Sequence, residues 1–439
     1  MNEADVVVAH PGTQHSYEAA VAFQQAGLLQ EYITGIYFRM TGTLRRLLTL
    51  APDKVSRAVL SQLARRHRPG LREALVRTRP LPEAAYLAST RLPLPAWVSS
   101  QLLQLRNLLF DRFVASRIEE LSPAVVVCYD TCALQGFRAA SRVGALRVLD
   151  QTNCHLAWSS ELADPEGSSN FHSSLHQRMP PRWLIGQCIE EAKLANVILA
   201  GSGFVKESLA YSGVNVDKVV ILPYGADIEL FSPAPKKSPD GPVTVAFAGQ
   251  IGLRKGTPYL LDAFHRLERL NCRLLLIGQV QRNGQWLEKY HGHYEHVPFV
   301  PRVELAHYLR RADVFVYPSL REGSALAIYE ALASGLPVIT TPNSGSVVRD
   351  KIEGFVIAPR DVGALADKIE QLVVNEDLRR TMGEAARKRA EEYSWSNYHR
   401  RLVAVIREAL VEQNSGGYRG KTIINGFAGL HRPESRGPS

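Results

Sequence analysis

The chain has 439 residues, with 52 Lys and Arg against 43 Asp and Glu, which gives a formal net charge of +9. Its 45% hydrophobic and 22% charged residues are typical of a folded protein and exclude a disordered or fibrous one. A chain of this length predicts two domains, because single cores stop growing at roughly 250 to 300 residues. The sequence contains no apolar run of about 18 residues, so no membrane-spanning helix is expected.

The first 38 residues predict the opening of an α/β domain. A β-branched run at residues 6–9 breaks at Pro11 and Gly12, and a helical pattern follows at residues 16–26. Residues 33–38 are the next candidate strand. A strand, a glycine turn and a helix in this order are typical of α/β domains.

The positive charge lies in one segment. Residues 39–117 hold 15 basic and four acidic residues, a local charge of +11, whereas the rest of the chain carries 37 basic and 39 acidic residues. Leucines such as Leu44 and Leu47 recur at helical spacing with arginines on the other face. We therefore predict a cationic, amphipathic helical insert over about residues 39–117.

The alternation of strands and helices then resumes and is repeated after a linker at residues 232–242, which is rich in proline and serine. The apolar runs predict parallel sheets that are covered on both faces. We expect an α/β protein with two doubly wound, Rossmann-like domains, residues 1–231 and 243–394, facing a cleft. Ligands of such sheets bind at the carboxyl ends of the strands. Residues 416–439, biased toward glycine, arginine, proline and serine, predict a flexible tail.

The most informative segment is residues 317–340. Glu322, Gly323 and Ser324 lie in a loop between a strand and a helix, and Glu330 follows Glu322 by eight positions. Amides at a helix start suit a phosphate or a sugar hydroxyl, and carboxylates accept hydrogen bonds from sugar and ribose hydroxyls. The alternative is that Glu322 is a helix-terminal charge and Glu330 a solvated helix residue.

This segment resembles the signature of the family 4 retaining glycosyltransferases, which are group 1 glycosyltransferases with the GT-B fold. The matching residues are EGSALAIYEALASGLPVI, and FAGQIGLRKGTPYLLDAF resembles the first loop of the family's donor domain. Further matches extend the resemblance over about residues 197–393. It implies that residues 1–231 bind the acceptor, that residues 243–394 bind the donor, and that a helix at residues 395–415 crosses back to the N-terminal domain.

The resemblance also implies roles for single residues in the donor half. Glu330 would hold the ribose hydroxyls of the nucleotide and Glu322 the hydroxyls of the transferred sugar. The amides of Gly323, Ser324 and Ala325 would lie against the diphosphate or the sugar. The cations expected to neutralise the diphosphate as the glycosidic bond breaks are Arg254 and Lys255. Gln250 stands where the family often has an arginine, and Arg254 is the candidate to compensate.

The N-terminal half matches the family less closely. Gly12 lies in the first loop, where the resemblance implies contact with the donor. Gln14 and His15 are the candidate acceptor-binding residues, and His155, after a strand, would lie near the transferred sugar. Glu322, Lys255 and His155 form the expected catalytic set. For each histidine the alternative is a hydrogen-bonded loop residue.

The expected reaction is the transfer of a hexose, with retention, from a nucleotide-diphosphate sugar to a hydroxyl of a glycan or lipid-linked acceptor, in the synthesis of cell-surface polysaccharide or glycolipid. The donor half contains no Asp-x-Asp, so basic side chains and helix dipoles are expected to replace a metal ion. No cofactor is expected beyond the nucleotide-sugar co-substrate. The alternatives are a GT-B-like sugar-nucleotide epimerase or hydrolase and a non-catalytic scaffold.

The cationic insert has three interpretations: a nucleic-acid surface, an anionic membrane surface or a solvated helix face. The insert lacks the interleaved aromatic residues that favour nucleic acid. Arginine on one face and leucine on the other favours anionic lipid, at about 1 kcal/mol per basic residue. Five scattered cysteines are typical of reduced cytosolic thiols. We therefore expect a cytoplasmic protein that contacts the inner face of the cytoplasmic membrane, and no nucleic-acid partner.

Overall fold

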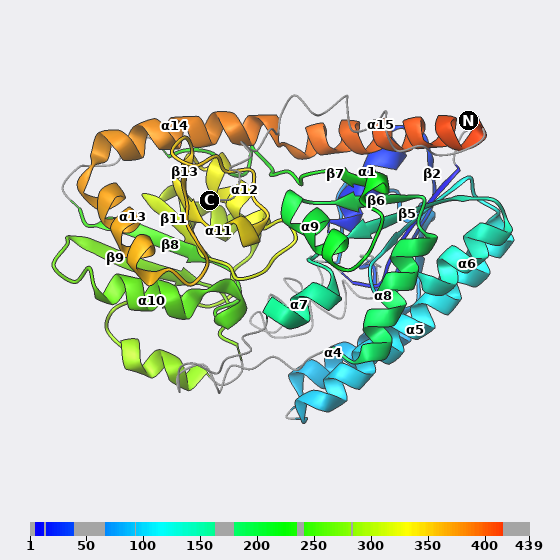
Figure 1. The fold of residues 1–439 in the computed structure, drawn as a ribbon, viewed down its shortest axis with the longest axis horizontal. Coiled ribbons are helices and arrows are strands. Elements are labelled where there is room, and N and C mark those ends of the chain that lie inside the picture. Colours follow the sequence, from blue (N-terminus) through cyan, green and yellow to red (C-terminus); the bar gives the residue numbers. More distant parts are fainter. Residues whose placement is uncertain are drawn as a thin grey trace, which may run out of the picture.

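The computed structural model describes residues 5–12, 15–38, 66–92, 94–162, 180–234, 241–281 and 284–415. These residues form two α/β halves that lie side by side, with two long helices along one side of both (Figure 1). Gln14, residues 39–65 of the predicted insert, residues 235–240 of the linker and the predicted tail at 416–439 lie outside the described residues.

The first half contains a seven-stranded parallel sheet in the order β3-β2-β1-β4-β5-β6-β7. Its strands are β1 Val6–His10, β2 Leu29–Thr34, β3 Val76–Thr78, β4 Val125–Tyr129, β5 Leu146–Gln151, β6 Val197–Ala200 and β7 Val219–Ile221. β1 and β4 are buried along their whole length because helices cover both faces of the sheet. Strand order reverses between β1 and β4, which places the ligand crevice at their carboxyl ends.

The helices of the first half cover this sheet and extend beyond it. They are α1 Ser16–Gln25, α4 Pro80–Arg91, α5 Ala96–Leu121, α6 Leu134–Arg142, α7 Leu156–Leu162, α8 Arg182–Leu194 and α9 Gly203–Tyr211. Figure 1 shows α4, α5 and α8 together at one end of the molecule, with α7 between them and the second half. No helix among the described residues is long and apolar enough to cross a membrane.

The second half contains a six-stranded parallel sheet in the order β10-β9-β8-β11-β12-β13. Its strands are β8 Val243–Ala248, β9 Cys272–Ile277, β10 Glu295–Val297, β11 Val314–Tyr317, β12 Val338–Thr340 and β13 Gly354–Val356. Its helices are α10 Thr257–His265, α11 Arg302–Arg310, α12 Leu326–Ala333, α13 Val362–Val374 and α14 Glu376–Glu392. The predicted pair of doubly wound, Rossmann-like domains is confirmed.

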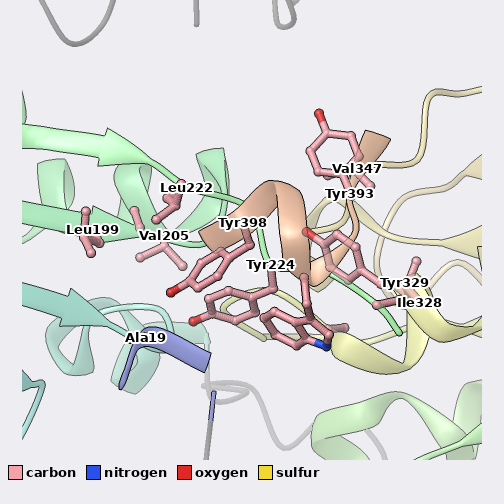
Figure 2. Packing of buried hydrophobic residues seen from close by; sticks show 14 of the residues in the cluster. Ala19, Leu199, Val205, Leu222, Tyr224, Ile328, Tyr329, Val347, Tyr393 and Tyr398 are labelled. Atoms are coloured by element: carbon pink, nitrogen blue, oxygen red, sulfur yellow. The ribbon is translucent and has the colours of Figure 1, made fainter. Parts of the chain in front are cut away.

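Helix α15, Trp395–Asn414, returns from the second half to the first. It packs on α1, and His399 lies 3.0 Å from Glu18. Figure 2 shows how Tyr224, from the segment after β7, and Tyr398 of α15 lie close to Tyr329 of α12 between the halves. The two halves are therefore joined both by the chain after β7 and by α15.

Two expectations about elements were wrong. The second strand spans Leu29–Thr34 and not residues 33–38. Its polar Glu31 is buried because Arg77 and Arg117 form ion pairs with it, at 3.0 and 2.9 Å. The described part of residues 39–117 is also not wholly helical, because β3 adds a strand to the edge of the first sheet.

Five of the nine described arginines of this insert form ion pairs with acidic residues of the fold. Arg66 and Arg106 both contact Glu83 at 2.8 Å. Arg68 contacts Glu18 at 2.7 Å, in addition to the pairs that Arg77 and Arg117 make with Glu31. Five arginines of the insert therefore neutralise acidic groups of the fold.

Candidate functional site

The loops that follow β8 and β11 meet at the carboxyl edge of the second sheet. These two strands are neighbours at the point where strand order reverses, so their loops must adjoin. The hydroxyl of Ser319 and the amide of Leu320 both donate hydrogen bonds to the carbonyl of Arg254, each at 3.0 Å. The loop after β11 therefore holds the backbone that carries Arg254 and Lys255.

Gly256 fixes the course of the loop after β8. It ends a short 3₁₀ turn, Leu253–Lys255, with φ of 72°, in the left-handed region that favours glycine. A Cβ at this position would overlap the carbonyl of Pro318. The chain can therefore turn into α10 beside the second loop and still direct Lys255 toward Glu322.

Arg254 and Lys255 converge on one carboxylate. Nη1 of Arg254 and Nζ of Lys255 both donate hydrogen bonds to Oε1 of Glu322, and Lys255 also donates to the Tyr317 hydroxyl at 2.5 Å. Lys255 and Glu322 are 8% and 9% exposed. Burial lowers the pKa of Lys255 to about 8, while Glu322 opposes that change. The group carries two positive charges and one negative charge in a partly dry environment.

Glu330 lies on α12 and is also paired. Arg302, the first residue of α11, lies 2.7 Å from its carboxylate and 5.6 Å from the centre of the Phe231 ring. Burial raises the pKa of Glu330, and the charge of Arg302 lowers it. Burial also raises the pKa of Tyr317, with the carboxylates of Glu322 and Glu330 adding to that rise. Glu322 is therefore linked to the end of β11 through Lys255, whereas Glu330 is held by Arg302 of α11.

The backbone between the two carboxylates reaches the first half of the molecule. The hydroxyl of Ser202 donates to the carbonyl of Gly323 at 2.5 Å, and a Cβ on Gly323 would overlap the carbonyl of Thr152. The Ala325 amide donates to the carbonyl of Ser344 at 3.1 Å, so it is engaged within its own half. No described residue accepts a hydrogen bond from the amides of Gly323 or Ser324. These two amides are available to a ligand between the halves.

The candidates near the N-terminus have different surroundings. Gly12 follows β1, and its carbonyl accepts a hydrogen bond from Nδ1 of His10 at 3.0 Å. His15 is buried: its Nε2 lies 2.8 Å from Asp150, and its ring lies 4.0 Å from the ring of Tyr224. His15 thus belongs to the packed junction between the halves, and the structure does not bring its side chain to Glu322.

His155 is fully buried at the start of α7. Its amide donates to the Ser208 hydroxyl at 2.8 Å, and its Nε2 has no hydrogen-bond partner among the described residues. Burial lowers the pKa of His155, which favours the neutral imidazole. The preceding Thr152, and not the His155 side chain, makes the close contact with Gly323.

Two arginines near the site, Arg302 and Arg321, were not predicted from the sequence. Nη1 of Arg321 donates to the carbonyl of Ser159 at 2.5 Å and also to the Ser159 hydroxyl, across the boundary between the halves. Arg321 directly precedes Glu322, and that position was its only signal in the sequence.

One group of described residues could hold a metal ion, and it lies away from this site. His265, Glu268 and His293 have ligand atoms within 4.8 Å of one another. His265 ends α10, Glu268 precedes β9 and His293 precedes β10, so they lie at the amino edge of the second sheet, opposite Lys255 and Glu322. The described cations near Glu322 and Glu330 at the carboxyl edge include Arg254, Lys255, Arg302 and Arg321.

The chemistry open to the site follows from these groups. Two cations and two backbone amides suit a diphosphate, which carries negative charge on several oxygens. Two buried carboxylates suit hydroxyl groups on either side of it. A ligand with a diphosphate between two polyhydroxyl units would match every described group at this edge.

Known proteins resemble the chain in sequence and in fold. Residues 230–389 match the family described as glycosyl transferases group 1. The D-inositol 3-phosphate glycosyltransferase of Mycobacterium bovis is 27% identical over 278 residues, which are 58% of this chain and 57% of that protein. This chain spans little more than half the length of the curated relatives it matches.

Two solved structures share the fold over nearly the whole chain. HepE of Anabaena, in complex with UDP, has a TM-score of 0.61 at 14% identity and covers 92% of this chain and 100% of its own. Sucrose-phosphate synthase of Thermosynechococcus elongatus has a TM-score of 0.64 at 15% identity and covers 93% of this chain and 99% of its own.

Proposed function

We propose that the chain, whose residues 230–389 match the group 1 glycosyltransferases, belongs to this family and moves a hexose from a nucleotide-diphosphate sugar to a hydroxyl of a glycan or lipid-linked acceptor. The observation that supports this most directly is the convergence of Arg254 and Lys255 on Glu322, in the loop that leads to the helix carrying Glu330. The UDP bound by HepE, a protein of similar fold, agrees with a nucleotide-sugar donor.

In this proposal the donor lies across the carboxyl edge of the second sheet. Glu330 takes the ribose hydroxyls and Glu322 the hydroxyls of the sugar, while Arg254, Lys255 and the amides of Gly323 and Ser324 hold the diphosphate. Donor binding exchanges the present ion pairs of Glu322 and Glu330 for pairs with the ligand.

The chemistry needs charge stabilisation at the leaving group. As the bond between the anomeric carbon and the phosphate oxygen breaks, negative charge grows on the diphosphate, and Arg254 and Lys255 stabilise it. The acceptor hydroxyl attacks from the same face and gives its proton to the departing phosphate, which retains the anomeric configuration. Because these side chains supply the positive charge, we propose that no metal ion is required.

The first prediction tests the site directly. We expect Glu330→Ala and Lys255→Ala each to abolish transfer, because one removes the ribose contact and the other a cation at the leaving group. Matched controls are Glu384→Ala and Lys388→Ala on the exposed face of α14, which should transfer sugar at the wild-type rate. Release of nucleoside diphosphate and mass analysis of the product measure activity, and circular dichroism verifies folding. Wild-type activity in either site variant would refute the assignment.

The same assay separates the alternatives. A panel of UDP- and GDP-sugars is incubated with the protein and an acceptor extract. A new glycoside together with the nucleoside diphosphate supports transfer. Epimerised or hydrolysed donor without a glycoside indicates an epimerase or hydrolase, and no turnover with any donor indicates a scaffold. The stereochemistry of the product, read by NMR, tests retention.

A further inference from the structure

A groove with an apolar lining opens beside the candidate site, between α5, α7 and α8. It has a volume of about 810 Å³, within the range of roughly 300 to 1,000 Å³ that is typical of ligand pockets. Its apolar lining includes Leu105 and Leu108 of α5, Leu156 of α7 and Trp183 of α8. The groove lies at the end of the molecule where Figure 1 shows α4, α5 and α8 together.

The apolar residues of this groove are unusually exposed. Trp183 is 55% exposed, Leu105 is 47% exposed and Leu108 is 42% exposed. Trp97 and Leu109, also on α5, are 54% and 36% exposed. Single exposed leucines are ordinary, but large apolar side chains gathered along one helix and around one hollow indicate a binding surface.

The polar end of the groove points to the candidate site. Among the described residues that line the groove, Arg321 is the one with a charged side chain. Arg321 is also the residue next to Glu322, and it contacts Ser159, another lining residue, at 2.5 Å. The groove therefore combines exposed apolar side chains with the charged side chain of Arg321, the residue next to Glu322.

We propose that this groove binds the hydrocarbon chain of an amphiphilic, phosphate-bearing acceptor, with the phosphate at Arg321 and the accepting hydroxyl toward Glu322. The inference rests on the proposed function, because it names the acceptor class of that transfer. Two observations favour this ligand. The positive charge of Arg321 suits a phosphate, and Arg321 adjoins Glu322 of the proposed donor site. A purely electrostatic membrane contact fits less well, because five arginines of the insert are already paired with Glu18, Glu31 and Glu83.

A binding assay tests the acceptor class without requiring turnover. The probe is 12-bromododecyl phosphate below its critical micelle concentration, whose bromine quenches tryptophan fluorescence on contact. We expect saturable quenching of the full chain and loss of most of it in Trp183→Phe, because Trp183 lines the groove. Shortening the chain to 8-bromooctyl phosphate should weaken binding at least about tenfold, since buried methylene groups supply the affinity.

Variants separate the apolar groove from the charged end. We expect Leu105→Gln/Leu108→Gln to weaken binding of the dodecyl probe at least fivefold. Its matched control, Val374→Gln/Val411→Gln, changes residues that are 65% and 66% exposed on other helices and should bind normally. Arg321→Gln should weaken binding of the phosphate probe but leave 12-bromododecanol unaffected. Competition by inorganic phosphate alone would show a free-phosphate site without a chain.

The outcomes distinguish this inference from the proposed function. Quenching that survives both the Leu105→Gln/Leu108→Gln change and Trp183→Phe overturns the groove as the site. Absence of binding, combined with transfer to a water-soluble sugar, overturns the amphiphilic acceptor and leaves the transferase intact. If the probe binds in the groove but no acceptor is glycosylated, the groove remains a binding site and the proposed transferase function is overturned.

Discussion

The charge of Lys255 depends on its burial and on its neighbours. It lies against Tyr317, Glu322 and Arg254, and burial lowers its pKa to about 8, against an ordinary value near 10.5. Lys255 can help Arg254 to stabilise a diphosphate leaving group only while its amine is protonated. The transfer rate is therefore tied to a proton that this lysine loses close to physiological pH.

The second prediction follows from that pKa. Below about pH 8 Lys255 is charged, and above it the amine becomes neutral, so kcat/KM should fall as pH rises through this value. In Lys255→Arg the guanidinium stays charged up to about pH 12, so the fall should disappear from whatever activity remains. Rate measurements from pH 6 to 9.5 provide the check, and an unchanged alkaline fall in the variant would assign it to another group.

The third prediction concerns Glu191, a fully buried carboxylate of α8. It accepts hydrogen bonds from the amides of Thr131 at 2.8 Å and Ala133 at 3.0 Å. Burial raises its pKa from 4.5 to about 8. Between these two values the folded protein keeps a proton that the unfolded chain has lost, so the free energy of unfolding should fall as pH rises across this window.

This contribution can reach about 1.4 kcal/mol per pH unit. Glu191→Gln resembles the protonated acid and should remove this pH dependence. From pH 5 to pH 8 the wild type should therefore lose stability relative to the variant. Urea denaturation at several pH values measures this. A constant difference would show that Glu191 is ionised throughout.

The sequence predicted the charged side chains of the motif as candidate site residues, but not the residues that contact them. Glu322, Glu330 and Lys255 were found because a local pattern contains them. Arg302 pairs with Glu330 from another helix, and His15 is enclosed by Asp150 and Tyr224. Such contacts depend on how distant segments pack, which one sequence does not reveal.

Elements are placed at the site by close approaches of the backbone. The loop after β11 touches the loop after β5 at Gly323 and Thr152, and Ser202 at the start of α9 bonds to the same glycine. Only a residue without a side chain fits there. The contact therefore sets how closely the two halves can meet around the donor.

The fourth prediction changes this contact. Gly323→Ala should lower transfer at least about tenfold, because a methyl group in that space pushes the halves apart and misplaces the reacting groups. The thermal midpoint should change little, because the overlap with Thr152 lies between the halves and not within the core of either. Small-angle X-ray scattering should show a larger radius of gyration. Wild-type activity with an unchanged radius would contradict the proposed approach.

Gly186→Ala serves as the matched control. Gly186 lies within α8, and a Cβ there would contact nothing within 4 Å. This change should keep the transfer rate and stabilise the protein by about 0.5 to 1 kcal/mol, as alanine does in place of glycine within a helix.

The sequence predicted most elements because their apolar runs are uninterrupted, as in β4 and β11. It misplaced β2, where Gln30 and Glu31 interrupt the apolar pattern, and it missed β3, which has three residues and an arginine at its centre. Strands at or next to the edge of a sheet whose polar residues form ion pairs carry little hydrophobic signal in the sequence.

Helix α15 links the two halves, because it continues from the second half and packs on α1 of the first. Leu402, Val405 and Ile406 are fully buried, and the helix covers α1 of the first half while continuing from the second. Removing side chains here therefore affects both halves at once.

The fifth prediction tests that coupling. Leu402→Ala should cost about 2 to 5 kcal/mol of unfolding free energy, as large-to-small changes in a core do. Arg407→Ala, on the exposed side of the same helix, should change it by less than about 0.5 kcal/mol. Urea denaturation followed by fluorescence and by circular dichroism gives both values. If Leu402→Ala leaves the unfolding free energy unchanged by both fluorescence and circular dichroism, α15 is not part of the cooperative unit.

The charge of the insert illustrates what composition can reveal at this scale. The local charge of +11 was predicted to mark a membrane-facing surface, and this stays a prediction. Arg66, Arg68 and Arg106 are held by buried glutamates of the fold. A count of charges does not show which of them meet. The exposed leucines and tryptophans of α5 and α8 are the feature that the count concealed.

The hydrogen bond between Ser202 and Gly323 has a consequence for the kinetics of ligand capture. A donor whose diphosphate reaches the Gly323 amide must enter where the two halves already touch. Each encounter then waits for that bond to open, so the observed association rate should level off at high donor concentration. The limiting rate would equal the rate at which the two halves of the unliganded protein open. A more stable closed state would slow donor association and also lengthen the residence time of the bound donor.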